Sequence, residues 1–372
     1  MTNARAESAN PTEAAARRAD ERRAFLDAAG WGAAIALPMA GDASTRSYER
    51  LTLGDRRAVL MNAPPAAESA ACPPDASPAE RRRLGYNAMA RLAGPNLNAF
   101  TAIAGALRAA GLSAPGIYAA DAKLGFAVIE DLGDDLYARA IPAGADEFEL
   151  YASAIDALLA LHQAAPEAPD QAGYRMLTYD RTAMEAEVML VPDWYWPHLK
   201  GEAAGEAVSA EYADAWSEVL AKLPQPSTLV MRDFHAENVL WLPDRAGHRR
   251  AGVIDFQDGL FGNPAYDLVS LLEDARRDVS PELAEAMIRR YAAGAGAFSD
   301  FDEEAYRRDY AILGAQRNAK ILGIFARLIR RDGKPRYADF FPRVEGHFRR
   351  DLQHKDLHEV ARFFRRHFPE RF

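Results

Sequence analysis

The sequence predicts an α+β protein with two lobes, in which a small strand-rich N-lobe precedes a larger, mostly helical C-lobe. The chain has 372 residues, more than a single domain usually contains, so two packed units are expected. Short β-like segments dominate the first third, whereas apolar residues recur at helical spacing through most of the remainder. We place the boundary at residue 132, which gives an N-lobe of residues 21–132 and a C-lobe of residues 133–372.

The N-lobe is expected to follow a disordered N-terminus, residues 1–20. Residues 1–12 are small and polar, which favours disorder, while helical periodicity starts at Thr12 and runs to Ala29. After that helix the sequence predicts a β-hairpin, a loop with five prolines, a helix stopped by a glycine and a buried strand. These four elements cover residues 48–61, 63–78, 98–110 and 126–129.

The C-lobe is predicted to contain five helices and one small β-island. The helices are assigned from apolar residues at helical spacing and cover residues 148–162, 210–223, 281–291, 306–329 and 357–364. The β-island comprises three short apolar segments, residues 229–231, 239–242 and 252–256.

Composition excludes several classes of protein. The 54 acidic and 45 basic residues give a net charge of −9, which argues against a general nucleic-acid binder. The single cysteine, Cys72, excludes an internal disulfide and a cysteine-built zinc site. No segment has the roughly 18 uninterrupted apolar residues of a membrane span, and the N-terminus lacks the apolar core of a signal peptide. We therefore expect a cytoplasmic protein with small-molecule partners, no nucleic acid and no membrane, and we favour a monomer.

Residues that suit phosphoryl transfer are concentrated between positions 231 and 267. Asp233 is followed five residues later by Asn238, and Asp255 ends a hydrophobic strand. Oxygen ligands such as Asn238 and Asp255 suit Mg²⁺, which keeps several waters and bridges substrate phosphates. Asp233 can accept the proton of an attacking hydroxyl and align it. Each residue alone also fits a turn, but three at these spacings are better explained by chemistry.

This segment resembles the catalytic loop and metal-binding segment of the aminoglycoside phosphotransferase family, small-molecule kinases with a bilobal protein-kinase-like fold. In that family the loop commonly reads His-Gly-Asp-Leu-His-x-x-Asn, and the metal segment reads Ile-Asp-Phe or Ile-Asp-Trp. Asp233, His235 and Asn238 match the loop, and Asp255 matches the metal-binding aspartate. The resemblance implies a kinase that uses ATP and Mg²⁺, with Asp233 as catalytic residue and Asn238 and Asp255 as metal ligands.

Further motifs resemble one subgroup of the family, the bacterial cell-wall-recycling kinases that phosphorylate N-acetylmuramate and N-acetylglucosamine at the anomeric hydroxyl. These motifs lie at residues 41–44, 60–65, 130–134, 273–278, 314–318 and 331–335. The likeness covers residues 22–368, nearly the whole chain. It implies that an amino sugar accepts the phosphate at its C1 hydroxyl and that the reaction serves peptidoglycan recycling.

Three neighbours of the catalytic loop receive roles from the same resemblance. His235 matches a residue near the transferred phosphate and is taken as substrate-binding, although a structural histidine explains it equally well. Arg232 either orients the loop or pairs with a surface acid, and we favour a structural role. Asp267 is expected to accept hydrogen bonds from the backbone of the catalytic loop.

The nucleotide site departs from the protein-kinase pattern. Protein kinases carry a lysine on the third strand, paired with a glutamate on the following helix. The matching strand here, residues 58–62, has no lysine, and the helix at residues 98–110 has no acid. The two losses fit together, because a buried glutamate without its lysine is an unpaired charge.

Other groups are therefore needed around the nucleotide. We expect Arg46 to supply a cation over the phosphates, and the anion-binding backbone amides are assigned to Ala43, Ser44 and Thr45. By resemblance, residues 130–132 form the hinge, with backbone groups of Glu130 and Leu132 facing adenine.

The acceptor side has two sets of candidates. Asp193, Trp194 and Tyr195 place a carboxylate beside aromatic rings, which suits a sugar, although such a cluster also fits core packing. Asp258 follows the metal segment closely enough to reach the acceptor.

Three arginines are candidates for binding a substrate carboxylate, since the guanidinium fork matches a carboxylate: Arg276, Arg277 and Arg317. Each is more often part of a surface ion pair.

Two alternatives remain open from the sequence. The same fold also serves acceptors such as aminoglycosides, choline or other amino alcohols, and Asp193 with Asp258 provides the acidic groups that a polycation needs. The absent lysine also fits a non-catalytic nucleotide-binding regulator, although the intact set of Asp233, Asn238 and Asp255 argues against it.

Overall fold

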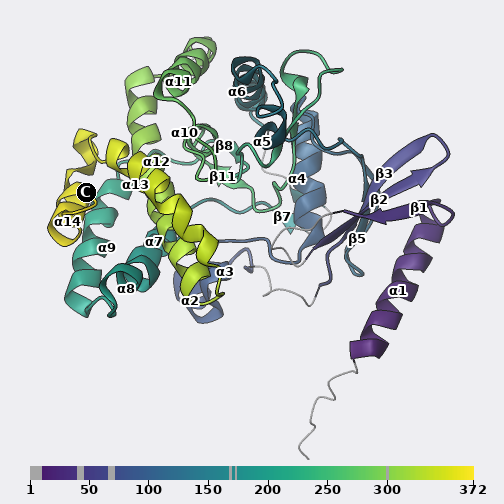
Figure 1. Cartoon of the computed structure of the whole chain (residues 1–372), viewed down its shortest axis with the longest axis horizontal. Helices are drawn as coiled ribbons and strands as arrows, with labels where there is room; N and C mark the ends of the chain where they lie inside the picture. Colours follow the sequence, from purple (N-terminus) through teal and green to yellow (C-terminus); the bar gives the residue numbers. More distant parts are fainter. Residues whose placement is uncertain (1–10, 40–45, 66–71, 167–169, 172–173, 299–300) are drawn as a thin grey trace, which may run out of the picture.

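The fold is shown in Figure 1, a computed structural model that describes residues 11–39, 46–65, 72–166, 170–171, 174–298 and 301–372. An antiparallel sheet and helix α1 (Pro11–Ala28) lie at one end, and most helices gather at the other end. The predicted α+β class is therefore confirmed. No helix in the described ranges is both long and apolar enough to cross a bilayer.

Five strands form the antiparallel N-lobe sheet, in the order β1-β2-β3-β5-β4. They are β1 (Ile35–Pro38), β2 (Ser47–Leu53), β3 (Arg56–Asn62), β4 (Ile117–Asp121) and β5 (Phe126–Ile129). The predicted hairpin turns at Gly54, whose φ of 59° suits glycine. Strand β1 escaped prediction because it is an edge strand that exposes Ile35, so its apolar residues do not report burial.

The remaining strands pair in twos. They are β6 (Asp170–Gln171) with β7 (Tyr174–Arg175), β8 (Thr228–Val230) with β11 (Leu260–Gly262), and β9 (Val239–Trp241) with β10 (Ala251–Val253). The predicted β-island corresponds to β8, β9 and β10.

The helices after α1 are predominantly in the C-terminal two thirds. They are α2 (Pro78–Leu84), α3 (Tyr86–Met89), α4 (Leu97–Ala109), α5 (Tyr137–Ala140), α6 (Glu147–Ala164), α7 (Arg181–Val188), α8 (Trp196–Lys200), α9 (Glu206–Leu220), α10 (Ala265–Leu272), α11 (Pro281–Ala295), α12 (Glu303–Arg330), α13 (Phe341–Asp351) and α14 (His358–His367). A π-helix, η1 (Val191–Tyr195), and three 3₁₀ turns complete the set: η2 (Gly247–Arg250), η3 (Pro335–Phe340) and η4 (Lys355–Leu357). All predicted helices are present.

Helix α1 covers one face of the sheet. Phe25 stacks on Phe126 of β5 with ring centroids 5.5 Å apart, and Arg22 pairs with Glu49 of β2. Because α1 begins at Pro11, the predicted disorder is wrong for residues 11–20, whose helix packs on the strands. Residues 1–10 lie outside the described part of the chain.

The opposite face of the sheet joins the main core. Val59 and Met61 of β3 belong to the same hydrophobic cluster as Ile103 and Leu107 of α4. Strand β3 is thus found where it was expected, and it carries apolar side chains toward α4 where protein kinases place lysine.

Helices α2 and α3 depart from the predicted division of the chain. Although they lie within residues 21–132, they pack against α7 of the C-lobe (Figure 1). Buried Arg81 of α2 pairs with Asp180 at 2.6 Å, and Arg327 of α12 lies over the ring of Tyr86 at 5.0 Å. Within the predicted N-lobe, this excursion therefore contacts the C-lobe, and ion pairs of Arg81 and Arg91 with Asp180 hold it there.

Candidate active site

Two short antiparallel ladders shape the loop that carries Asp233. Strand β8 pairs with β11 and leads into residues 231–238, and β9 follows and pairs with β10. Because Val239 pairs with Val253, the residues just outside this ladder, Asn238 and Asp255, are brought together.

The three residues of the predicted motif meet at this point. The amide nitrogen of Asn238 donates to the backbone oxygen of Asp233 at 2.9 Å and lies 3.4 Å from Oδ2 of Asp255. Gln257 donates to Oδ1 of Asp255 at 2.9 Å and so fixes that carboxylate. The side chains of Asn238 and Asp255 are thus in contact, and each carries an oxygen atom of the kind that Mg²⁺ prefers.

Asp267, at the start of α10, holds the loop backbone as expected. Its carboxylate accepts from the backbone N–H groups of Met231 at 2.7 Å and Arg232 at 2.9 Å. Arg232 has a φ of 71° and Asp255 a φ of 59°, a left-handed conformation that costs a non-glycine residue about 1–3 kcal/mol. Such strain persists only where surrounding contacts fix the backbone, and Asp267 provides them at Arg232.

The side chain of Arg232 is at the centre of a buried charge cluster with Glu187 of α7 and Lys320 of α12. Arg232 is 2% exposed and Glu187 is fully buried, and the two form a direct ion pair. Lys320 approaches the same carboxylate at 3.2 Å, and Gln316 donates to it at 2.9 Å. The structural role of Arg232 is therefore supported, but its partner is a core acid rather than a surface acid.

This cluster also acts on Asp233. Burial alone raises the pKa of an aspartate, but the charges of Lys320, His235, Arg232 and Arg317 outweigh it and lower the pKa of Asp233 below its usual value. Asp233 is therefore ionised at neutral pH, and its carboxylate can accept a hydrogen bond from a hydroxyl group. Among these charges, Lys320 lowers the pKa of Asp233 most, yet it was not among the predicted site residues. The sequence offers one indication of its role, which is that it lies one helical turn after the candidate residue Arg317.

His235 lies buried in the same loop. Its Nε2 is 3.4 Å from Asn238 and 3.4 Å from Arg276, and burial lowers its pKa to about 4. The neutral imidazole of His235 contacts both Asn238 and Arg276. Its position is therefore compatible with the substrate-binding role and with the structural role that the sequence allows.

Arg46 reaches the motif from the N-lobe. It donates to the backbone oxygen of Gly94 at 3.1 Å, and its charge opposes the rise in pKa that burial causes at Asp255 and Asp258. The structure thus brings this predicted cation close to the predicted metal ligand. Ala43, Ser44 and Thr45 lie outside the described residues.

Asp258, predicted to reach the acceptor, is hydrogen-bonded to the segment between α3 and α4. Its Oδ1 accepts from the backbone N–H of Ala93 at 2.6 Å, and its backbone oxygen is 3.4 Å from Arg232. The segment between α3 and α4 therefore contributes to the site through backbone hydrogen bonds of Ala90, Ala93 and Gly94. Sequence motifs could not reveal these residues, because their side chains take no part in the bonds.

The predicted hinge joins the two lobes. The carboxylate of Glu130 accepts from Arg245 at 2.7 Å and from the backbone N–H of Gly116 at 3.0 Å. The backbone N–H of Glu130 donates to Gly116, so its side chain and N–H are both structural, while Leu132 follows in the connection toward α5. Asp131 pairs with Arg50 of β2 at 2.8 Å.

The aromatic cluster at residues 193–195 lies on η1. Tyr195 is fully buried, and its hydroxyl donates to Glu345 at 2.6 Å, so its predicted contact with substrate is wrong. The π-helix η1 packs against α12, where a Cβ on Gly323 would stand 2.3 Å from Leu190. Asp193 and Trp194 belong to the same turn, in which Asp193 is exposed and Trp194 packs on the core, so their predicted role in substrate binding stays a prediction.

Arg317 of α12 is 5% exposed, and its charge acts on both Asp233 and His235. Its buried Nη1 has no hydrogen-bond partner within the described residues. The structure therefore places Arg317 beneath the catalytic loop.

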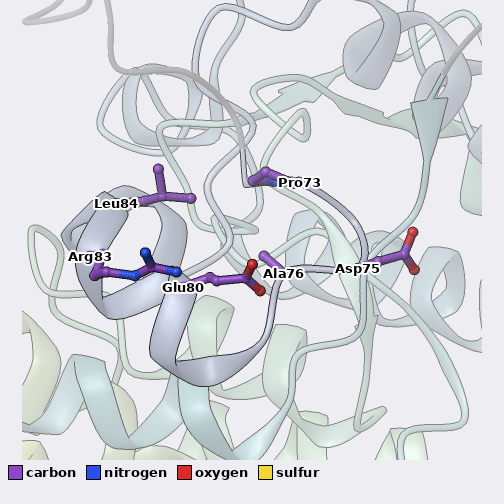
Figure 2. Close-up of a pocket in the computed structure, with 6 residues that line it drawn as sticks. All are labelled: Pro73, Asp75, Ala76, Glu80, Arg83 and Leu84. Carbon is purple, nitrogen blue, oxygen red and sulfur yellow. The ribbon is translucent and has the colours of Figure 1, made fainter.

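A separate cavity of about 380 Å³ lies beside α2 and is shown in Figure 2. Most of its lining side chains are exposed, including Asp75, Glu80 and Arg83. It contains none of the residues of the catalytic loop, so we do not place the chemistry there.

Comparison with known proteins decides the family. The model of the Phosphotransferase enzyme family matches residues 36–308, well over half of the chain. The chain belongs to this family. The phosphotransferase family predicted from the Asp233–Asp255 segment is thus confirmed.

Relatives and solved structures agree with this assignment. The chain is 48% identical to the N-acetylmuramate/N-acetylglucosamine kinase of Caulobacter vibrioides over 94% of this chain and 96% of that protein. It is 35% identical to the kinase of the same name from Pseudomonas aeruginosa, over 85% and 84%.

Two solved structures share the fold of this phosphotransferase at low identity. A microcompartment-associated aminopropanol kinase gives a TM-score of 0.52 at 15% identity, over 86% of this chain and 92% of that one. A thermostable mutant of an aminoglycoside phosphotransferase, in complex with AMP-PNP and hygromycin B, gives 0.50 at 14% identity, over 88% and 98%.

Proposed function

We propose that this phosphotransferase is an ATP-dependent kinase that phosphorylates the C1 hydroxyl of N-acetylmuramate and N-acetylglucosamine, in peptidoglycan recycling. The observation that carries the proposal is the 48% identity to a kinase named for both sugars, over 94% of this chain and 96% of that protein. Because the reaction consumes ATP, we assign it to the cytoplasm.

Asp233 is the proposed catalytic residue. Its carboxylate orients the C1 hydroxyl and takes the proton as the hydroxyl oxygen bonds to the γ-phosphorus and ADP leaves. Support comes from the surrounding cations, which keep the pKa of Asp233 low and its carboxylate ionised. Positioning of the two reactants supplies much of the remaining rate enhancement.

Asn238 and Asp255 are the proposed Mg²⁺ ligands. Support comes from the contact between the two side chains, both of which carry oxygen ligands. Burial and the nearby Asp233 carboxylate raise the pKa of Asp255, and a bound divalent cation would relieve that repulsion. With two protein ligands, Mg²⁺ would complete its coordination shell with phosphate oxygens and water. When bound, Mg²⁺ neutralises charge that develops on the phosphates.

ATP is proposed to bind between the lobes. The backbone carbonyl of Glu130 and the backbone N–H of Leu132 face adenine, and Arg46 with the amides of residues 43–45 contacts the phosphates. Support comes from Arg46, whose charge reaches Asp255.

An acceptor screen tests the function. ADP release, coupled to a spectroscopic assay, is measured with N-acetylmuramate, N-acetylglucosamine, kanamycin and choline at saturating Mg·ATP. We expect turnover with the two amino sugars and a sugar 1-phosphate by mass and NMR analysis. Turnover with kanamycin or choline alone would reassign the acceptor, and binding of Mg·ATP without ADP formation would indicate a regulator.

Removing the proposed metal ligand is expected to weaken the response to Mg²⁺. In Asp255→Ala, the Mg²⁺ concentration for half-maximal rate should rise by about 10- to 100-fold, because one of two protein oxygens is lost. The measurement is the initial rate with N-acetylglucosamine across a Mg²⁺ titration. Asp244→Ala, an exposed aspartate in the turn after β9, is the matched control. An unchanged Mg²⁺ dependence in Asp255→Ala would exclude it as a ligand.

A further inference from the structure

A pocket of about 430 Å³ lies beside the catalytic loop, and its lining includes two of the arginines that the sequence offers as ligands for a carboxylate, Arg276 and Arg277. Its charged lining residues are Glu237, Asp274, Arg276, Arg277, Asp278 and Arg343. Residues 274–278 follow α10, Arg343 comes from α13, and Glu237 belongs to the catalytic loop itself. The pocket therefore begins where the proposed reaction takes place.

Arg276 connects the pocket to the catalytic loop. Its Nε pairs with Glu237 at 3.1 Å, and its Nη1 is 3.4 Å from Nε2 of His235. His235 and Glu237 both lie between Asp233 and Asn238 in the sequence. An anion held by Arg276 would thus lie against the loop that carries the proposed catalytic residue.

The backbone around Arg276 is fixed by Asp274. This fully buried carboxylate accepts from the backbone N–H of Ala236 at 3.2 Å and from that of Arg276 at 2.8 Å. Asp274 therefore ties the pocket to the catalytic loop.

The present partners of the arginines are replaceable. Arg343 forms a bidentate pair with Asp278, whose side chain is 85% exposed, and Arg277 pairs with half-exposed Glu147. Ion pairs with exposed acids are worth little, so an incoming carboxylate can take their place. The buried Nε of Arg277 has no hydrogen-bond partner among the described residues, so the ion pair with Glu147 leaves this guanidinium incompletely bonded.

The chemistry of the two proposed acceptors differs at one group that suits such a pocket. N-acetylmuramate carries a lactyl ether that ends in a carboxylate, whereas N-acetylglucosamine has a hydroxyl at that position. The carboxylate is attached to the same ring as the reacting C1 hydroxyl, so it must bind close to the catalytic loop. Arginine forks match carboxylates in geometry and charge.

We infer that the pocket of Arg276, Arg277 and Arg343 receives the carboxylate of N-acetylmuramate, so that it sets the preference of the enzyme for the acidic over the neutral sugar. The inference rests on the proposed function.

Selectivity between the two sugars is the measurement. In Arg276→Gln and, separately, Arg343→Gln, kcat/KM is determined for both sugars at saturating Mg·ATP. We expect the ratio of kcat/KM for N-acetylmuramate to that for N-acetylglucosamine to fall by about 10-fold or more in Arg276→Gln, since a charge-assisted hydrogen bond is lost. Arg276→Lys keeps the charge without the fork, so its ratio should be intermediate. Arg289→Gln, an exposed arginine of α11, should leave the ratio unchanged.

Three results would overturn the inference. They are an unchanged ratio in both variants, an equal loss with both sugars, and a rise in KM for ATP without a change in the ratio, which would assign the arginines to nucleotide phosphates. If the wild-type chain phosphorylates neither sugar, the proposed function fails instead. Calorimetric titration with each sugar in the absence of ATP then still tests the pocket, because N-acetylmuramate should bind more weakly to Arg276→Gln than to the wild type.

Discussion

Asp233→Asn should reduce kcat with N-acetylglucosamine by about 10²–10⁴-fold, the usual contribution of a positioned general base. The amide keeps the size of the side chain but cannot take the proton of the C1 hydroxyl. Binding of Mg·ATP, measured by calorimetry, should be largely retained, because Asn238 and Asp255 are unchanged.

The control for this variant is Asp214→Asn on α9, which removes an exposed carboxylate of the same type. Its kcat should equal that of the wild type. Normal turnover in Asp233→Asn, at the protein concentration and metal level of the wild-type assay, would contradict the assignment of the base. Loss of both turnover and nucleotide binding would point to a collapsed loop, which circular dichroism and thermal unfolding would reveal.

Glu187→Ala should lower the free energy of unfolding by about 3–5 kcal/mol, because it leaves Arg232 and Lys320 as buried cations without their carboxylate. The measurement is urea unfolding followed by tryptophan fluorescence. A fall in kcat should accompany the loss, since Arg232 lies in the strained part of the catalytic loop.

Glu185→Ala is the matched control on the same helix. Glu185 pairs with Arg181 at the surface, where both side chains are nearly half exposed, so its removal should cost no more than about 1 kcal/mol. If the two variants unfold at the same urea concentration, the buried charge cluster does not stabilise the fold in the way described here.

The elements that could be predicted from the sequence are those with local causes. The β2–β3 hairpin is specified by two short segments with apolar residues on either side of a glycine turn, and helix α12 by its apolar periodicity. The motif of Asp233, Asn238 and Asp255 could also be predicted, because the short β9–β10 ladder brings together residues that are close in the chain.

The elements that could not be predicted depend on contacts between distant segments. Glu187 of α7 and Lys320 of α12 meet Arg232 only after both helices have packed, and nothing in their local sequence indicates it. Tyr195 was misassigned for the same reason. An aromatic residue beside an acid suits a sugar or a core equally well, and the docking of η1 on α12 decides for the core.

The excursion of α2 and α3 has a mechanical consequence. Beyond these helices, the chain is tied to the catalytic loop by Ala90 and Ala93 before it returns to the sheet, and it crosses again at Glu130, which Arg245 holds. Because both connections between the lobes are held by hydrogen bonds, we expect the sheet to rotate most easily about the line that joins them. A rotation of this kind would change the width of the space between the lobes, and Arg46, which donates to Gly94 beside the first crossing, lies near its axis.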